Sequence, residues 1–245
     1  MHSDEIKSLS NRLSDALHLQ VNPIGIGFFD TLSKGVGVFD EDMPKPASDG
    51  RTGRVSAGCV FWMKSTNSSF VTQAKDHYNC SVGSLTHGLV DFSQVASNND
   101  IAELVSSGWV SPQMVPTIPV VSKRHKYINY GPLSEAAFDP DVVLLRLNAR
   151  QLMIISDAIK LDIQGKPQCH IVALAKEHNK VAASVGCALS RARTGMSPNE
   201  MTCAIPFGRF EEIVNEIEKS VGIDSEVAKY AASDSRRFSG MKEKV

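Results

Sequence analysis

The segment Asp141-Val142-Val143-Leu144-Leu145-Arg146-Leu147 is nearly continuous in apolar side chains. A strand that is apolar on both faces must be covered on both faces, so this segment predicts a central strand of a sheet. Directly after it, Asn148 and Gln151 have the spacing of a helical capping box. Leu152, Ile155 and Ile159 then supply the buried stripe of the helix that would follow.

Other segments extend the same pattern outward. Strands are predicted at 24–29, 69–73, 127–133, 181–185 and 201–205. An amphipathic helix is predicted to end near His18, another to start at Pro167, and a third to bury Phe210 and Ile217 and stop at Gly222. Strands and helices mix without strict alternation. We therefore expect an α+β or α/β fold, with one mixed β-sheet and packed helices.

The bulk composition limits the class of protein. The chain has 245 residues, 42% of them hydrophobic and 22% charged, with a formal net charge of −1. We expect a single domain over residues 1–222, with a long loop at 33–56 to which we assign no chemistry, and a polar tail at 223–245. The weak charge argues against nucleic-acid binding. No apolar run suggests a membrane span or a secretory signal. We expect a cytoplasmic protein with a small-molecule substrate or ligand, and a homodimer as the default assembly.

Four of the five cysteines are candidates for a shared site: Cys59, Cys80, Cys169 and Cys187. In a reducing compartment such residues are more often buried, catalytic or metal-bound than disulfide-bonded. Cys169 lies at a predicted helix start, where unpaired N–H groups favour a thiolate. The segment around Cys59 predicts either a helix start or a buried strand.

The spacing of these cysteines also fits a simpler interpretation. The chain contains no CxxC pair, and the separations 80 − 59 = 21 and 187 − 169 = 18 match no strong metal motif. Free cysteine is often a small buried hydrophobic residue. Cys203, inside the apolar run 201–205, is predicted to be of this kind.

Two histidines and one arginine are candidate catalytic residues. His77 precedes Cys80 by three residues and His87 follows it by seven, so either can serve as a ligand or an acid/base group. Alternatively, both histidines can cap the short helix predicted there or form hydrogen bonds with the backbone. Arg191 follows Cys187 and is a candidate contact to an anionic substrate. The basic run 123–126 fits a solvated turn, or such an anion contact.

The combination of elements resembles the domain of unknown function 169 family, an uncharacterised cysteine-rich group of archaea and bacteria. The shared features include Gly58-Cys59, Cys80 with Gly83, the run 138–143 (FDPDVV), Gly186-Cys187 and the run 205–207 (IPF). The resemblance implies conserved cysteines at the four candidate positions and none at Cys203, which favours a shared site. This chain departs from the family pattern around Cys80 and after Cys59. The family implies no established reaction.

Three functions remain open. The first is a metal- or iron–sulfur-cluster-binding protein, with redox or lyase-type chemistry on a small polar molecule. In it, Cys59, Cys80, Cys169 and Cys187 would hold an iron–sulfur cluster, or zinc. The second is a metal-free cysteine enzyme, partnered by His77 or His87. The third is a non-catalytic module that binds zinc or a small molecule.

Overall fold

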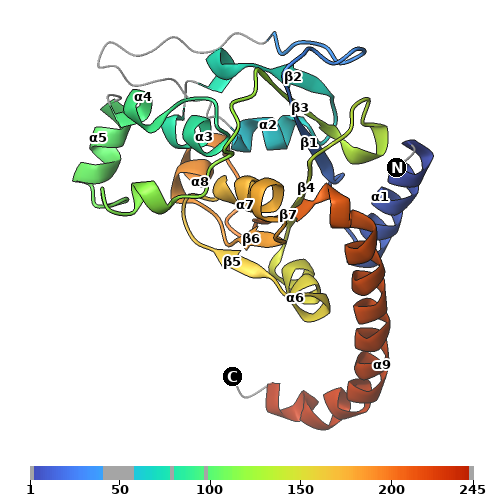
Figure 1. Cartoon of the computed structure of the whole chain (residues 1–245). Coiled ribbons are helices and arrows are strands. Elements are labelled where there is room, and N and C mark those ends of the chain that lie inside the picture. The colour runs from blue at the N-terminus through green and yellow to red at the C-terminus, as the bar shows by residue number, and fades with distance from the viewer. Residues whose placement is uncertain (1–2, 41–57, 78–79, 97–98, 243–245) are drawn as a thin grey trace.

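A computed structural model describes residues 3–40, 58–77, 80–96 and 99–242 (Figure 1). Its centre is a sheet with the strand order β2-β3-β1-β4-β7-β6-β5. The strands are β1 (Ile24–Phe29), β2 (Phe70–Thr72), β3 (Tyr127–Pro132), β4 (Val142–Leu147), β5 (Asp162–Gln164), β6 (Ala182–Ser184) and β7 (Met201–Pro206). Only β5 and β6 pair in parallel, so the sheet is mixed, as predicted. The apolar segment that begins at Asp141 forms β4, in the middle of the sheet.

Helices pack around this sheet. They are α1 (Ser3–Leu17), α2 (Cys59–Lys64), α3 (Ser81–Thr86), α4 (Phe92–Ala96), α5 (Asn99–Ser106), α6 (Ala149–Ala158), α7 (His170–His178), α8 (Ala188–Thr194) and α9 (Phe210–Lys242). Short 3-10 helices lie at Ala74–His77, Val115–Thr117, Leu133–Glu135 and Phe207–Arg209. Among the helices of the described residues, none has the length and apolar character that a membrane span requires.

The two faces of the sheet bury different sets of side chains. Alternate residues of a strand point to opposite faces. Val143 and Leu145 of β4 therefore pack with α1, α6 and α9, in a core that we call the α9 face. Val142 and Leu144 point the other way, toward α2, α3 and α7, in a core that we call the cysteine face. Figure 1 shows α1 and the start of α9 on one side of the sheet, and α3, α7 and α8 on the other.

Several local predictions are confirmed. The capping box is present, with Asn148 Oδ1 accepting from the Gln151 backbone and Gln151 Oε1 accepting from the Asn148 backbone. Residues 59–64 form a helix rather than a strand. Cys203 is fully buried in the α9 face, as predicted for a core thiol. The predicted loop at 33–56 extends outside the described residues, and in its described part Val38 forms a bridge with Val71.

The predicted helix start at Pro167 is wrong. Helix α7 begins at His170, and Cys169 is its N-cap rather than a residue inside the first turn. The backbone bonds from Ile171 to Gln168 and from Val172 to Cys169 span three residues, which is the pattern of a turn that tightens into a helix. The Gln168 side chain donates to Ser190 Oγ at 3.0 Å and ties this turn to α8.

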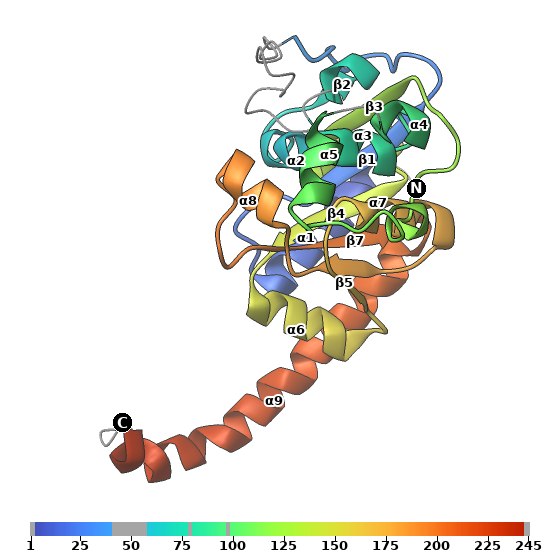
Figure 2. The ribbon, with the colours of Figure 1, turned by 90° about the vertical axis from the view of Figure 1, so that its left-hand side faces the viewer.

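The predicted helix stop at Gly222 is also wrong. Helix α9 continues to Lys242, so the described part of the polar tail is helical. A glycine inside a helix costs only about 1 kcal/mol relative to alanine. Gly222 is not among the glycines with positive φ, which a helix-ending glycine usually needs. Figure 2 shows this part of α9 extending away from the body of the molecule. Ile223 and Val227, which lie in it, are exposed.

Candidate functional site

The four candidate cysteines line one cavity on the cysteine face. The cavity has a volume of about 20 Å³ and is bounded by Cys59, Cys80, Cys169 and Cys187, together with Val82, Pro167, Gln168, Leu189 and Ser190. That volume is roughly the room that one water molecule needs. The structure thus brings together side chains from two halves of the chain that lie more than 80 residues apart in sequence. We call this the cysteine cavity.

Each of the four cysteines stands at the start of a helix. Cys59 is the first residue of α2, and Cys80, Cys169 and Cys187 are the N-caps of α3, α7 and α8. Cys80 Sγ accepts a hydrogen bond from the Gly83 backbone N–H at 3.4 Å, as an N-cap oxygen usually does. Helix N-termini carry unpaired N–H groups and a partial positive charge. The cavity wall therefore favours anionic sulfur or an anionic group bound to it.

Two of the thiols, those of Cys59 and Cys169, are nevertheless held protonated in the protein alone. Burial raises the pKa of Cys59, and a hydrogen bond with Ser190 offsets part of that rise. Burial raises the pKa of Cys169 well above its usual value, and the neighbouring Cys80 and Cys59 raise it further. A free nucleophilic thiolate is therefore disfavoured at these two positions near pH 7. Metal binding would remove the protons, because a coordinating thiol is deprotonated outright.

Gln168 and Thr202 place further polar atoms beside the thiols. Gln168 is 1% exposed, and its Oε1 has no hydrogen-bond partner among the described residues. Gln168 also lines a second small cavity with Cys59, Met196 and Thr202, and Thr202 Oγ1 is likewise unpartnered within the described part of the chain. Two buried polar atoms next to the thiols thus remain able to bind a ligand.

Tyr130 brings a third such group toward the cysteines. It lies on β3 and is completely buried, and its hydroxyl lacks a partner in the described ranges. Burial raises the pKa of Tyr130 well above its usual value, and the nearby Cys59 and Cys169 contribute to the increase. The sequence analysis did not single out Tyr130 or Gln168. The inward alternation of the strand 127–133 could have placed Tyr130 in the core, but not beside the cysteines.

His77 is buried close to Tyr130, with 6.5 Å between the ring centroids. Its Nε2 lies 2.9 Å from Thr72 Oγ1, and that hydroxyl itself donates to the Ile128 carbonyl. His77 Nε2 is therefore the donor of the pair, and Nδ1 carries a lone pair with no partner in the described residues. Burial lowers the pKa of His77 well below its usual value, and His87 lowers it further.

His87 repeats this arrangement from the end of α3. Its Nδ1 lies 2.8 Å from the Gly83 carbonyl oxygen, which can only accept, so Nδ1 carries the proton. Nε2 then holds a lone pair, again without a partner in the part of the chain described. Burial lowers the pKa of His87 to about 4. The rings of His77 and His87 are 6.1 Å apart, and neither residue lines the cysteine cavity itself.

Arg191 has a structural role in its present contacts. Its Nη2 donates to the carbonyl oxygens of Val185, Pro198 and Glu200, at 3.2, 3.1 and 2.9 Å. These bonds hold the segment after β6 against the loop before β7. Gly186 has φ +112°, and a Cβ there would lie 2.0 Å from Arg191 Nη1. The positive φ favours glycine at position 186, and its lack of a Cβ leaves room for the Arg191 guanidinium. The catalytic role of Arg191 stays a prediction.

The donor chemistry of the cysteine cavity fits iron–sulfur clusters or zinc, which thiolates ligate. The side-chain positions do not yet form a ligand set. Within residues 3–40, 58–77, 80–96 and 99–242, no group of three or more His, Cys, Asp or Glu side chains is placed to hold a metal ion. Coordination would therefore require the thiols to move from their present positions.

The fold and site define an α/β protein with a mixed sheet and a buried thiol cavity formed where helices begin. Residues 12–216 match the DUF169 family, described as "Uncharacterised ArCR", and the chain belongs to this family. The predicted family is therefore confirmed. The description of the family as cysteine-rich is not confirmed, because this chain has five cysteines in 245 residues. No curated protein and no solved structure matches the chain.

Proposed function

We propose that this protein binds a thiolate-ligated metal cofactor in the cysteine cavity, with an iron–sulfur cluster as the preferred occupant. One observation carries the proposal: four cysteines, each at the N-terminus of a different helix, line the same cavity. Inert core thiols have no physical reason to gather at helix starts. Cys203, alone on the opposite face of the sheet, shows how such a thiol is placed in this protein.

The distribution of the ligands favours a cluster over a structural zinc site. Structural zinc sites usually draw their cysteines in close pairs from short loops. Here each cysteine comes from a separate helix, and the Gly83 backbone N–H donates to Cys80 Sγ, which is the kind of contact by which a protein tunes a cluster. Gln168 Oε1 and the Tyr130 hydroxyl, both unpartnered among the described residues, add polar groups at the border of the site.

A single zinc ion is the second candidate, and the size of the cavity favours it. A volume of about 20 Å³ suits one ion once the thiols have moved into coordinating positions, whereas a cluster also needs the walls to move outward. Zinc would also accept four thiolates in a tetrahedral arrangement.

The catalytic part of the proposal is redox or lyase-type chemistry on a small polar molecule. His77 and His87 support it, because each keeps a lone pair on a buried ring nitrogen that has no partner among the described residues. Each imidazole can therefore accept a proton or a hydrogen bond. Tyr130 is a polar neighbour of both an imidazole and the thiols, since its ring lies 6.5 Å from that of His77 and its pKa is raised by burial and by the thiols of Cys59 and Cys169.

The test is anaerobic purification, followed by a visible absorption spectrum and by iron, sulfide and zinc analysis. Brown protein with stoichiometric iron and sulfide supports the cluster, and colourless protein with one zinc supports the second candidate. Cys187→Ser should lose most of the metal, and Cys203→Ser, the matched control on the other face, should keep it. Circular dichroism checks that both variants fold. Absence of metal after reconstitution, or loss of metal only in Cys203→Ser, would reject the proposal.

A further inference from the structure

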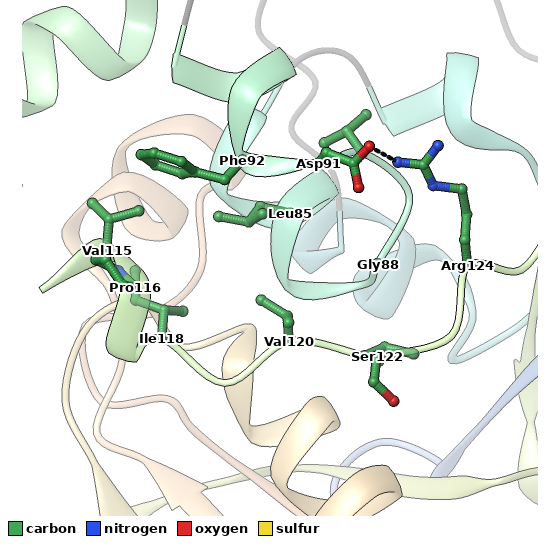
Figure 3. Close-up of a pocket in the computed structure, with 12 residues that line it drawn as sticks. Leu85, Gly88, Asp91, Phe92, Val115, Pro116, Ile118, Val120, Ser122 and Arg124 are labelled. Atoms are coloured by element: carbon green, nitrogen blue, oxygen red, sulfur yellow. Dashed lines mark ion pairs between the residues drawn. The ribbon is translucent and has the colours of Figure 1, made fainter.

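A cavity larger than the cysteine cavity lies at the other end of α3. It has a volume of about 340 Å³ and is lined by Leu85, Gly88, Val90, Asp91, Phe92, Val115, Pro116, Ile118, Val120, Val121, Ser122 and Arg124. Figure 3 shows these side chains around one hollow, with the apolar groups gathered on one side and the charged pair at its edge. Its volume is within the range of about 300–1,000 Å³ that is usual for small-molecule sites.

The walls of this cavity come from two segments that are fixed to each other. Residues 85–92 form one wall and residues 115–124 form the other. The Val121 backbone N–H donates to the Thr86 carbonyl oxygen at 2.9 Å. Gly88 has φ +68°, and a Cβ at that position would lie 2.3 Å from the Val121 carbonyl oxygen. The close approach of the two segments therefore depends on a glycine, and the cavity is pre-formed.

The interior and the rim have different character. Leu85, Val115 and Val121 are buried and form an apolar floor. At the rim, Phe92 is 49% exposed and Val120 is 36% exposed, so two large apolar side chains remain in contact with water. A ligand that covered them would gain roughly 25 cal/mol for each Å² of apolar surface removed from water.

Arg124 supplies the cationic group of the site. Its Nη2 contacts Asp91 Oδ2 at 2.5 Å and Gln94 Oε1 at 3.4 Å. Within the described residues these contacts use Nη2 alone, so Nε and Nη1 remain as donors, and either can form a two-pronged bond to a carboxylate together with an N–H of Nη2. Both Arg124 and Asp91 are more than half exposed. An ion pair of that kind contributes about 0–1 kcal/mol, so a ligand can share or replace Asp91 at little cost.

The neighbouring charges do not compete for this role. Lys123 pairs with Asp30 at 2.7 Å, away from the residues that line the cavity. The Ser122 hydroxyl donates to Glu177, so it is not a free donor toward a ligand. Arg124 is thus the cationic lining residue, and its guanidinium matches a carboxylate in a two-pronged hydrogen bond.

We propose that this cavity binds a small amphipathic carboxylate, with an aliphatic or aromatic body on the apolar floor and its anionic group on Arg124. The proposal is independent of the cysteine cavity and of any metal. It also assigns a role to the basic run 123–126 that the sequence alone leaves open. Helix α3 separates the two sites, with Cys80 at its start and Leu85 in its last turn.

Calorimetric titration of the full-length protein with octanoate tests the proposal, and octan-1-ol serves as the neutral probe. Octanoate should bind, and Arg124→Gln should weaken it by about 10- to 150-fold, because a hydrogen bond to a charged group contributes about 1.5–3 kcal/mol. The affinity for octan-1-ol should stay unchanged in that variant. Val120→Trp, on the exposed rim, should abolish binding of both probes by filling the entrance.

Met153→Trp on α6 is the matched control, since Met153 is 51% exposed and lies far from the cavity lining. It should bind both probes as the unmodified protein does. The proposal is overturned if octanoate does not bind, or if Val120→Trp binds it unchanged. Equal effects of Arg124→Gln on octanoate and octan-1-ol would overturn the carboxylate assignment.

Discussion

The two faces of the central sheet both bury apolar cores but differ in how their buried polar groups are satisfied. On the α9 face, Leu145, Ile205 and Phe210 pack in an apolar core, and the buried amide of Gln151 donates to the carbonyl oxygens of Leu17 and His18. On the cysteine face, the side chains of His77, His87 and Tyr130 are buried. Buried atoms on this face without a hydrogen-bond partner in the described ranges include Trp62 Nε1, His77 Nδ1, His87 Nε2, Tyr130 Oη, Gln168 Oε1 and Thr202 Oγ1.

We infer that the α9 face provides stability, whereas the buried polar groups of the cysteine face serve the function. An unsatisfied buried polar group costs about 1–3 kcal/mol, so a core selected for stability alone would not accumulate them. The α9 face can carry the fold, because its apolar contacts join both ends of the chain, from α1 to α9. The cysteine face can then hold groups that destabilise the free protein and are satisfied only when a ligand is bound.

The largest expected effect comes from breaking the α9 face. Phe210 is fully buried there, and Phe210→Ala should lower the free energy of unfolding by about 3–5 kcal/mol, as truncation of a core phenylalanine does. Urea unfolding measures the change. The folded fraction should keep its metal content per molecule, since Phe210 is on the other side of the sheet from the cysteine cavity. A loss below about 1 kcal/mol would mean that this face repacks and does not carry the fold.

The next effect comes from acid and acts on the cysteine face through His87. The unfolded chain protonates His87 below about pH 6.5, whereas the folded protein protonates it only near a pKa of about 4. The unfolded state therefore binds more protons between these values, and stability present above pH 6.5 is lost as the pH falls. Linkage gives about 2.5 kcal/mol lost between pH 7 and pH 4.5 from this residue.

The contribution of His87 to the pH dependence of stability is isolated by the variant His87→Gln. The control is His178→Gln, on the exposed end of α7. Urea unfolding at both pH values should show a shallower pH dependence for His87→Gln only. An unchanged pH dependence in His87→Gln would show that the ring is not buried in its neutral form.

The smallest effect should be the most informative about the site. Tyr130→Phe removes a buried hydroxyl that has no partner among the described residues, so the metal-free protein should change by less than about 1 kcal/mol or become more stable. In the metal-loaded protein the same variant should shift the visible spectrum or the reduction potential, because a hydrogen bond near the sulfur atoms would be lost. A loss above about 2 kcal/mol in the metal-free protein would show that the hydroxyl is already satisfied.

Local sequence signals predicted much of the fold. The apolar run after Asp141 gave the central strand, and Asn148 with Gln151 gave a helix start, because both depend on residues close in sequence. The C-terminal end of α9 was predicted wrongly, because Gly222 is only a weak signal for the end of a helix and nothing nearby in sequence forces the chain to turn. The start of α7 was misplaced because the turn at Gln168 is held by Ser190, which lies 22 residues away.

The sequence by itself determined which segments are apolar, which cysteine belongs to the core, and that Cys169 stands near a helix start. Only the tertiary structure decided that Cys59, Cys80, Cys169 and Cys187 all stand at helix starts and share a cavity, that Gln168 lines it with Tyr130 nearby, and that Arg191 holds a loop. It also decided that Leu85 and Arg124 line a separate pocket. The physical reason is that the distance between residues far apart in the chain is fixed by how the helices pack on the two faces of the sheet, and local propensity does not encode that packing.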